Sequence, residues 1–599
     1  MEKIPERSEI EQKYKWDLES IYSEDEEWRH SLENVRNRLG EFEPYKGKVC
    51  NNGETLLEIL GLVEVVAREM RLVGSYAKMH SDVDKRDQKF QSMLIEARSV
   101  ATELGGLTSF IEPEIQELGN KGLELLLKSN GELEIYRHYL SEIIRVKDHV
   151  RSAEVETLLA DMGEIFSAPN EIYGLLMHAD MSFPKVRGND QELIEITHVN
   201  FTKFMREGDR ETRKKVYQKF YREIGKFRNT IGAMLKNNII VDVKSSRAHN
   251  YENSRSAAMN DSNIPTEVYD GLVETVRENL DVLHRHIELK KKSQAIEKLK
   301  MWDLYVPMVS GDSPVIKYDQ AIDHVIESVS PLGEEYGEVL KEGLNSRWID
   351  VYENRGKYSG AYSGGTYDTK PFILMNYQND IQSMFTLAHE LGHSMHSKLT
   401  NTAQPYIYSG YDIFVAEVAS LVNEALLTEY LLENTEEESF RAYILDEAIE
   451  RFRSTLYRQT LFADFEHQIH QVVESGGALV PDRLDEIYKN IKNEFYKPIE
   501  MDKYIQREWM RIPHFYYNYY VYQYATGISA AVSLARDILD GKKNQREKYI
   551  SFLKSGSSKY PIDLLKETGV DMTSKKPIEN SISVYKKYLT EMESIIESE

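Results

Sequence analysis

Apolar residues recur every three or four positions over most of this chain, and that spacing constrains the fold more than any other feature. One apolar stripe runs from Leu56 to Tyr76, and residues 93–104 continue the same rhythm. Proline, which interrupts helices, accounts for only 16 of the 599 residues. The sequence therefore predicts a mostly α-helical protein. Further stripes cover 120–165, 208–245, 266–296, 318–344, 412–432, 438–476 and 516–540.

Prolines mark the expected start of two of these helices. Pro265 precedes a helix predicted from Thr266, and Pro481 precedes a helix predicted over 484–495. Only about 346–380 lacks a strong helical signal. It holds a glycine-rich loop at 359–365 and then an extended apolar run, 371–377, which predicts one small sheet. Loop-like stretches near residue 110 and residue 200 divide the chain into regions 1–110, 111–200 and 201–599.

Charge and composition exclude several classes of function. The chain carries 75 Lys+Arg against 99 Asp+Glu, a net charge of −24, which argues against nucleic acid and anionic membranes as partners. Its one cysteine, Cys50, excludes a disulfide framework. We see no apolar run long enough to span a membrane and no signal-peptide pattern. We expect a soluble, cytoplasmic protein, either a monomer or a small homo-oligomer.

The motif that carries chemistry is His389-Glu390-Leu391-Gly392-His393. On a helix, positions i and i+4 share a face, so both imidazoles can bind one metal ion. Zinc suits two neutral imidazoles and keeps a position for water. Glu390, beside the first ligand, can then act as general base on that water.

A third ligand is expected 24 residues after His393, where Glu417 interrupts an apolar run. An unpaired carboxylate there would be costly, and metal coordination would remove the cost. A chance H-E-x-x-H in a chain of this composition has a probability of roughly 5%. The competing interpretation is a core histidine pair with a solvated glutamate.

Several segments together resemble a known family. TLAHELGHSMHS, the preceding PFILMNY, the later FVAEVAS, the opening WDLESIY and the tyrosine-rich HFYYNYYVYQYATG are similar to oligoendopeptidase F. Enzymes of that kind belong to the thimet-oligopeptidase family of zinc metallopeptidases. The resemblance implies a large helical body with a small sheet beside the active-site helix, enclosing a deep substrate channel. It implies an oligopeptidase F N-terminal domain over 111–200 and a zinc metallopeptidase domain over 201–599.

Carried over to this sequence, the resemblance makes His389, His393 and Glu417 the ligands of one zinc ion and Glu390 the general base. It also implies groups on a C-terminal helix that stabilise the oxyanion, which we assign to His514 and Tyr524, with Tyr517 and Arg511 binding substrate. Helical spacing would put His514, Tyr517, Val521 and Tyr524 on one face. A tyrosine-rich packing face is the alternative.

Neighbouring residues receive lesser assignments. His396, one turn past His393, is expected to pack rather than to bind metal. Glu424, seven residues past Glu417, could accept the second N–H of a ligating histidine. The extended run 372–377 could pair with an extended substrate under the loop 359–365.

The sequence thus predicts a zinc-dependent endopeptidase that acts on internal bonds of short peptides. The alternative is a zinc carboxypeptidase or dipeptidyl carboxypeptidase on the same scaffold, which would need a cation such as Arg511 for the substrate's terminal carboxylate. A catalytically inactive helical scaffold is disfavoured, because it would have no use for Glu390.

Overall fold

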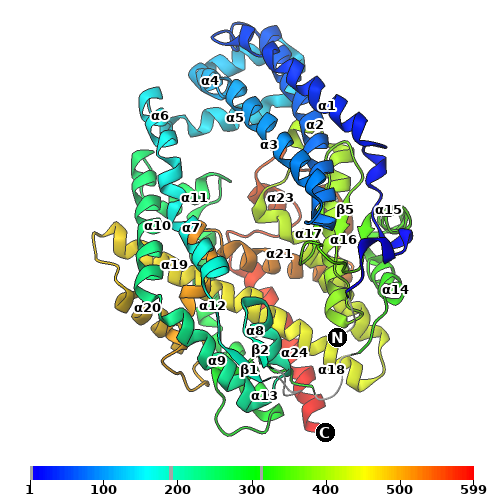
Figure 1. Cartoon of the computed structure of the whole chain (residues 1–599), viewed down its shortest axis with the longest axis vertical. Helices are drawn as coiled ribbons and strands as arrows, with labels where there is room; N and C mark the ends of the chain where they lie inside the picture. The colour runs from blue at the N-terminus through cyan, green and yellow to red at the C-terminus, as the bar shows by residue number, and fades with distance from the viewer. Residues whose placement is uncertain (1–3, 188–192, 310–313, 599) are drawn as a thin grey trace. The chain divides into compact units, whose positions relative to one another are not determined.

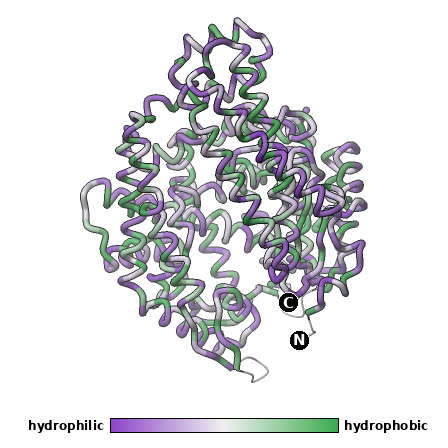
Figure 2. The backbone as a smooth tube through the Cα atoms, turned by 45° about the horizontal axis from the view of Figure 1, so that its top comes forward, coloured by the Kyte–Doolittle hydropathy of each residue, from purple (hydrophilic) through white to green (hydrophobic). Residues whose placement is uncertain are grey.

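A computed structural model describes residues 4–187, 193–309 and 314–598. Helices dominate these ranges and the strands are short, which confirms the mostly α prediction (Figure 1). Hydrophobic and hydrophilic residues alternate along the helical turns (Figure 2), as the apolar stripes predicted. None of the described helices is long and apolar enough to cross a membrane.

The chain forms two compact units whose segments alternate along the sequence. The first unit contains the chain up to Asp148 together with Pro314–Leu431 and Leu534–Thr568. Its helices are α1 Asp25–Arg38, α2 Gly53–Val83, α3 Gln88–Thr108, α4 Ile111–Ser129, α5 Arg137–Arg145, α14 Tyr318–Ser328, α15 Glu334–Asn345, α16 Ile381–Ala403, α17 Ile413–Asn434, α22 Gln545–Leu553 and α23 Pro561–Glu567.

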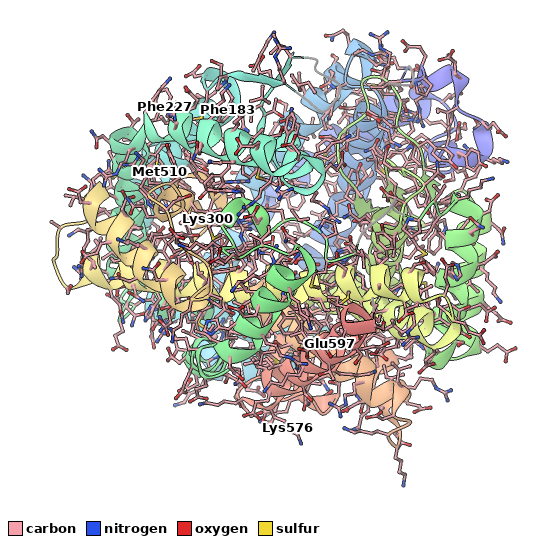
Figure 3. The ribbon with its side chains drawn as sticks, turned by 90° about the horizontal axis from the view of Figure 1, so that it is seen from below. Phe183, Phe227, Lys300, Met510, Lys576 and Glu597 are labelled. Atoms are coloured by element: carbon pink, nitrogen blue, oxygen red, sulfur yellow. The ribbon has the colours of Figure 1, made fainter. Side chains whose placement is uncertain are left out.

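The second unit contains His149–Ser313, Leu432–Ser533 and the chain from Gly569. In Figure 3, Lys576 and Glu597 mark the two ends of its last helix. Its helices are α6 Ala153–Asp161, α7 Gly163–Leu175, α8 His198–Glu207, α9 Arg210–Gly225, α10 Arg228–Ala248, α11 Ser254–Asn260, α12 Thr266–Glu278, α13 Leu280–Ser293, α18 Glu438–Arg451, α19 Arg458–Glu474, α20 Pro481–Phe495, α21 Tyr522–Leu539 and α24 Lys576–Ser598.

Helix starts follow the proline signals, but several long stripes are interrupted. Helix α12 begins at Thr266, and Pro481 is the first residue of α20. The stripe over 120–165 breaks where Asn130 leaves the helical conformation and caps the next turn. The long apolar stripes therefore predicted correctly that these segments are helical, but they predicted the lengths of the helices poorly. The caps and turns between consecutive helices do not disturb the spacing of the apolar residues.

The small sheet of the first unit is built from three strands in the order β3-β5-β4. The strands are β3 Ile349–Asp350, β4 Tyr362–Gly364 and β5 Phe372–Leu374. Strand β5 is buried, parallel to β3 and antiparallel to β4. The idea that 372–377 pairs with substrate is therefore wrong for 372–374, since both edges of β5 are occupied. The edge strands of this sheet are β3 and β4.

A second, two-stranded sheet was not anticipated. Strand β1 Lys185–Arg187 pairs antiparallel with β2 Leu193–Glu195 in a stretch that the sequence analysis treated as a loop between regions. Residues 188–190 of that stretch lie outside the described residues. The strands are three residues each, too short for a period-two pattern to stand out. The proposed boundaries near 110 and 200 stay predictions.

Candidate metal centre

Helix α16 carries the H-E-x-x-H motif through the buried part of the first unit. The side chain of Asp380 caps the helix by accepting the Ser383 backbone N–H at 2.7 Å. Leu387, Ala388 and Leu391 are buried on the helix, whereas His389 and His393 keep partly exposed side chains one turn apart. The helix thus directs both imidazoles to one side.

Glu417 of α17 completes a cluster of three ligand atoms. The Nε2 atoms of His389 and His393 are 3.2 Å apart, and Glu417 Oε2 lies 3.4 Å from the first and 3.8 Å from the second. All three lie within 4.8 Å of one another. Ligands at about 2.0–2.1 Å from a tetrahedral zinc ion are themselves about 3.3 Å apart. The donor set and its spacing therefore fit one zinc ion.

Close packing between the two helices sets this spacing. A Cβ at Gly392 would come within 2.6 Å of Ser420 Cα and 2.7 Å of the Ala419 carbonyl oxygen. The Asn423 side chain, also on α17, donates to the Ala388 carbonyl oxygen at 3.2 Å. Glycine at 392 lets α17 approach the face of α16 that carries the histidines.

Glu424 occupies the position that its spacing suggested. Its Oε1 lies 2.7 Å from His389 Nδ1. This pairing places the proton of a neutral His389 on Nδ1 and leaves the Nε2 lone pair for the metal. Burial alone would lower the pKa of His389, but Glu424 and the neighbouring carboxylates outweigh it and raise that pKa to about 9. Burial, together with the charge of His389, lowers the pKa of His393 to about 3.

The proposed general base, Glu390, is buried beside the ligands. Burial raises its pKa to about 7, with His389 opposing the rise and Glu417 adding to it. The backbone N–H of Ser363 in β4 faces this carboxylate and acts against the rise in its pKa. The hydroxyls of Ser363 and Ser394 lie 2.8 Å apart, so β4 is bonded to α16 directly after the motif. The sequence had placed Ser363 only within the loop 359–365 and predicted no contact between it and Glu390.

His396 packs as expected. Its ring is 1% exposed and stacks on Tyr411 with the ring centroids 3.8 Å apart and the planes 8° from parallel. Burial lowers its pKa to about 3. A neutral, stacked imidazole is a packing residue beside the cluster.

The C-terminal tyrosine-rich segment belongs to the second unit and is not the continuous helix that we predicted. Short 3₁₀ turns cover Ile505–Arg511 and Pro513–Tyr516, and α21 begins only at Tyr522. Pro513 lacks an N–H donor, and Tyr519 has a φ of 51°, which no α-helix accepts. The single-face argument for His514, Tyr517, Val521 and Tyr524 is therefore wrong.

The turns nevertheless bring the predicted residues together. The centroid of the His514 ring lies 6.4 Å from the ring centroid of Tyr517, 6.1 Å from that of Tyr520 and 5.6 Å from that of Tyr524. The hydroxyls of Tyr520 and Tyr524 are 3.3 Å apart. Val521 and Tyr522 are buried instead. Burial, and then the charge of Arg458, lowers the pKa of His514. Tyr520, for which the sequence predicted no role, joins this cluster.

Arg511 packs against aromatic rings other than those around His514. Its guanidinium carbon is 4.8 Å from the ring centre of Phe201 and 5.0 Å from that of Phe220. Its Nη1 is buried. The cation is thus held by aromatic faces, and its role toward substrate stays a prediction.

The left-handed backbone of Tyr519 is a feature that no sequence signal revealed. Its N–H donates to Glu466 Oε1 at 2.8 Å, and its hydroxyl lies 3.0 Å from His467 Nδ1. Burial raises the pKa of Glu466 to about 8, against the opposing charge of His470. A bulky residue at positive φ is strained, so α19 holds the turn that leads into Tyr520 and α21.

Comparison with known proteins adds family relationships to this geometry. Residues 203–584 match the family described as Peptidase family M3, and residues 114–183 match the one described as Oligopeptidase F. The chain is 42% identical over 594 residues to oligopeptidase PepF of Bacillus subtilis, covering 99% of this chain and 89% of that protein.

Two further relatives are similar over nearly their whole length. Group B oligopeptidase PepB of Streptococcus agalactiae is 38% identical, covering 98% of both chains. The crystal structure of oligoendopeptidase-F from Enterococcus faecium matches with a TM-score of 0.76 and 34% identity, covering 96% of this chain and 100% of that one. The similarity therefore extends well beyond the metal motif.

Proposed function

The chain belongs to peptidase family M3, and on that premise we propose that it is a zinc-dependent endopeptidase that cleaves internal bonds of short oligopeptides. The observation that carries this proposal is the set of three ligand atoms, His389 Nε2, His393 Nε2 and Glu417 Oε2, 3.2–3.8 Å apart beside the buried Glu390. The names of the relatives, oligopeptidase and oligoendopeptidase, support the class of substrate.

Each residue of the centre has a separate task in this proposal. His389, His393 and Glu417 hold the zinc ion, which when bound polarises the scissile carbonyl and lowers the pKa of water. Glu390 accepts the proton of the attacking water and passes it to the leaving amine. Glu424 keeps His389 in the tautomer that binds metal.

The developing oxyanion needs hydrogen-bond donors that stabilise its charge. We assign this role to His514 and Tyr524, because an imidazole and a phenol can both donate a hydrogen bond to that oxygen. Tyr517, whose side chain is exposed, and Arg511 are assigned to substrate binding. We further propose that 111–200 and 201–599 are the N-terminal and catalytic domains.

Internally quenched peptides of graded length, blocked at both ends, test this function. We expect cleavage of the doubly blocked peptides, an upper limit on peptide length, and about one zinc ion per chain. The Glu390→Gln variant should keep its zinc and lose most turnover, since only the base is removed.

The alternative function gives a different result in the same assay. A carboxypeptidase or dipeptidyl carboxypeptidase would cleave only peptides with a free C-terminus, so failure on doubly blocked peptides would favour that reading. Full activity without bound metal, or in Glu390→Gln, would overturn the mechanism.

A further inference from the structure

Strand β4 lies against Glu390, and the end of helix α2 holds that strand. We propose that Asp82 and Tyr362 are positioning residues: their hydrogen bond holds β4 against the end of α2, in the position at which the Ser363 N–H faces the Glu390 carboxylate. The inference rests on the proposed function for its catalytic consequence, but the clamp itself is a property of the first unit alone.

The hydrogen-bond pattern of the sheet directs Ser363 outward. The Ile373 N–H donates to the Trp348 carbonyl oxygen at 2.8 Å, on the side of β3. Because successive N–H groups of a strand alternate in direction, those of Phe372 and Leu374 face β4. Ser363 pairs with Ile373 and so turns its own N–H away from β5, toward the side on which Glu390 lies. On the same side its hydroxyl lies 2.8 Å from that of Ser394 in α16.

A buried carboxylate holds the residue before Ser363. Asp82, at 4% exposure, accepts the Tyr362 hydroxyl at 2.7 Å. The same carboxylate pairs with Lys78 at 2.8 Å and with Lys85 at 2.6 Å. Lys78 Nζ also lies 4.1 Å from the centre of the Tyr362 ring. Asp82 is thus charged and fully paired, which makes it a strong acceptor for the tyrosine.

The backbone between the two elements is tied as well. The Tyr358 N–H donates to the Asp82 carbonyl oxygen at 2.8 Å, and the Lys85 N–H donates to that of Gly356 at 2.7 Å. A Cβ at Gly356 would lie 2.2 Å from Asp84 Oδ1, and its φ is 83°. Only glycine permits so close an approach. The chain before β4 therefore runs along the end of α2, with the Tyr362 bond as its last attachment before Ser363.

This arrangement gives the N-terminal region a role in the chemistry. Without the Tyr362 bond, β4 would keep its hydrogen bonds to β5 but lose its side-chain attachment to the end of α2. The side of β4 that faces Glu390 would then be held less firmly. The Glu390 carboxylate would then lose part of its fixed orientation, a geometric loss that lowers kcat more than substrate binding.

The test compares Tyr362→Phe with the wild type by two measurements. Amide hydrogen exchange on the metal-free protein should become about tenfold faster in 359–365, while α16 keeps its protection. On the zinc-loaded enzyme, kcat for a doubly blocked peptide should fall about tenfold, with KM and zinc content unchanged.

A matched control and a double variant separate positioning from stability. Tyr377→Phe removes a comparable buried bond, from the Tyr377 hydroxyl to the Ile316 carbonyl oxygen, with no attachment to β4. It should leave both readouts unchanged. Asp82→Ala removes the same bond together with the ion pairs to Lys78 and Lys85. Adding Tyr362→Phe to Asp82→Ala should cause no further loss, since the bond is already absent. Lys78 and Lys85 are 52% and 43% exposed, so neither charge is stranded.

Two outcomes would overturn the inference: unchanged exchange in 359–365, or a kcat loss in Tyr362→Phe no larger than in Tyr377→Phe. Additive losses in the double variant would also contradict it. If the wild type failed to cleave any peptide, the proposed function would fall, yet the exchange result would still stand or fail independently.

Discussion

Glu424 shows how much of this site depends on a residue that does not touch the metal. Its carboxylate holds His389 Nδ1 at 2.7 Å, and Glu424 is itself 8% exposed. A histidine whose Nδ1 proton is held in this way presents its Nε2 lone pair to the metal and loses little orientational entropy when the metal binds. Glu424 thereby fixes the ring orientation of His389, the first of the three ligands.

Removing that acceptor should weaken metal binding while leaving the ligands in place. We expect Glu424→Ala to raise the zinc dissociation constant by about 10–100-fold, as measured by competition with a chelator. Glu424→Gln is the matched control, because its amide oxygen can still accept the Nδ1 proton, and it should lose much less. Equal losses in the two variants would mean that the charge of Glu424, rather than the hydrogen bond, matters.

At the scale of the elements, the metal centre depends on how closely α16 and α17 approach each other. Gly392 is the contact point, and the atoms that a Cβ would meet are backbone atoms of α17, which no side-chain rotation can move. The third ligand, Glu417, is on that same helix. The distance between the two helices therefore controls the distance between ligands.

Gly392→Ala should separate the helices and damage the site. We expect a loss of about 1–3 kcal/mol in the free energy of unfolding from overpacking, together with weaker zinc binding. Gly61→Ala is the control: Gly61 lies inside α2 of the same unit with no atom within 4 Å of its added Cβ. It should be neutral or stabilising by up to about 1 kcal/mol. Normal zinc affinity in Gly392→Ala would show that the packing tolerates the methyl group.

At the scale of the whole molecule, all the metal ligands belong to the first unit. Binding to the folded state alone stabilises a protein by mass action, by about 4 kcal/mol when free ligand exceeds its dissociation constant 1,000-fold. The free energy of zinc binding stabilises the folded state of the unit that holds the ligands. The two units should therefore respond differently to loss of the ion.

Chelation should expose this difference. We expect removal of zinc to speed amide exchange in α16 and α17 of the first unit, while α20 of the second unit keeps its protection. Restoring zinc should reverse the change, whereas magnesium, which prefers oxygen ligands, should not. An equal rise in exchange in α20 would mean that the ion stabilises both units together.

The features that the sequence by itself determined are local ones. The i, i+4 histidines, the adjacent Glu390 and the carboxylate of Glu417 in an apolar run predicted the metal centre, because helical geometry alone places the first three. The helical class followed from apolar spacing, and the family from motifs spread along the chain. Membership of family M3 is confirmed over 203–584.

Only the tertiary structure decided the rest, since those features depend on pairings between distant segments. Asp82 meets Tyr362 across 280 positions, and Glu466 meets Tyr519 across 53. The first contact attaches β4, an edge strand of the sheet, to the end of α2, and the second accompanies a left-handed turn where spacing had predicted helix. A buried carboxylate can select a backbone conformation that local propensity disfavours, and no window of sequence contains both partners.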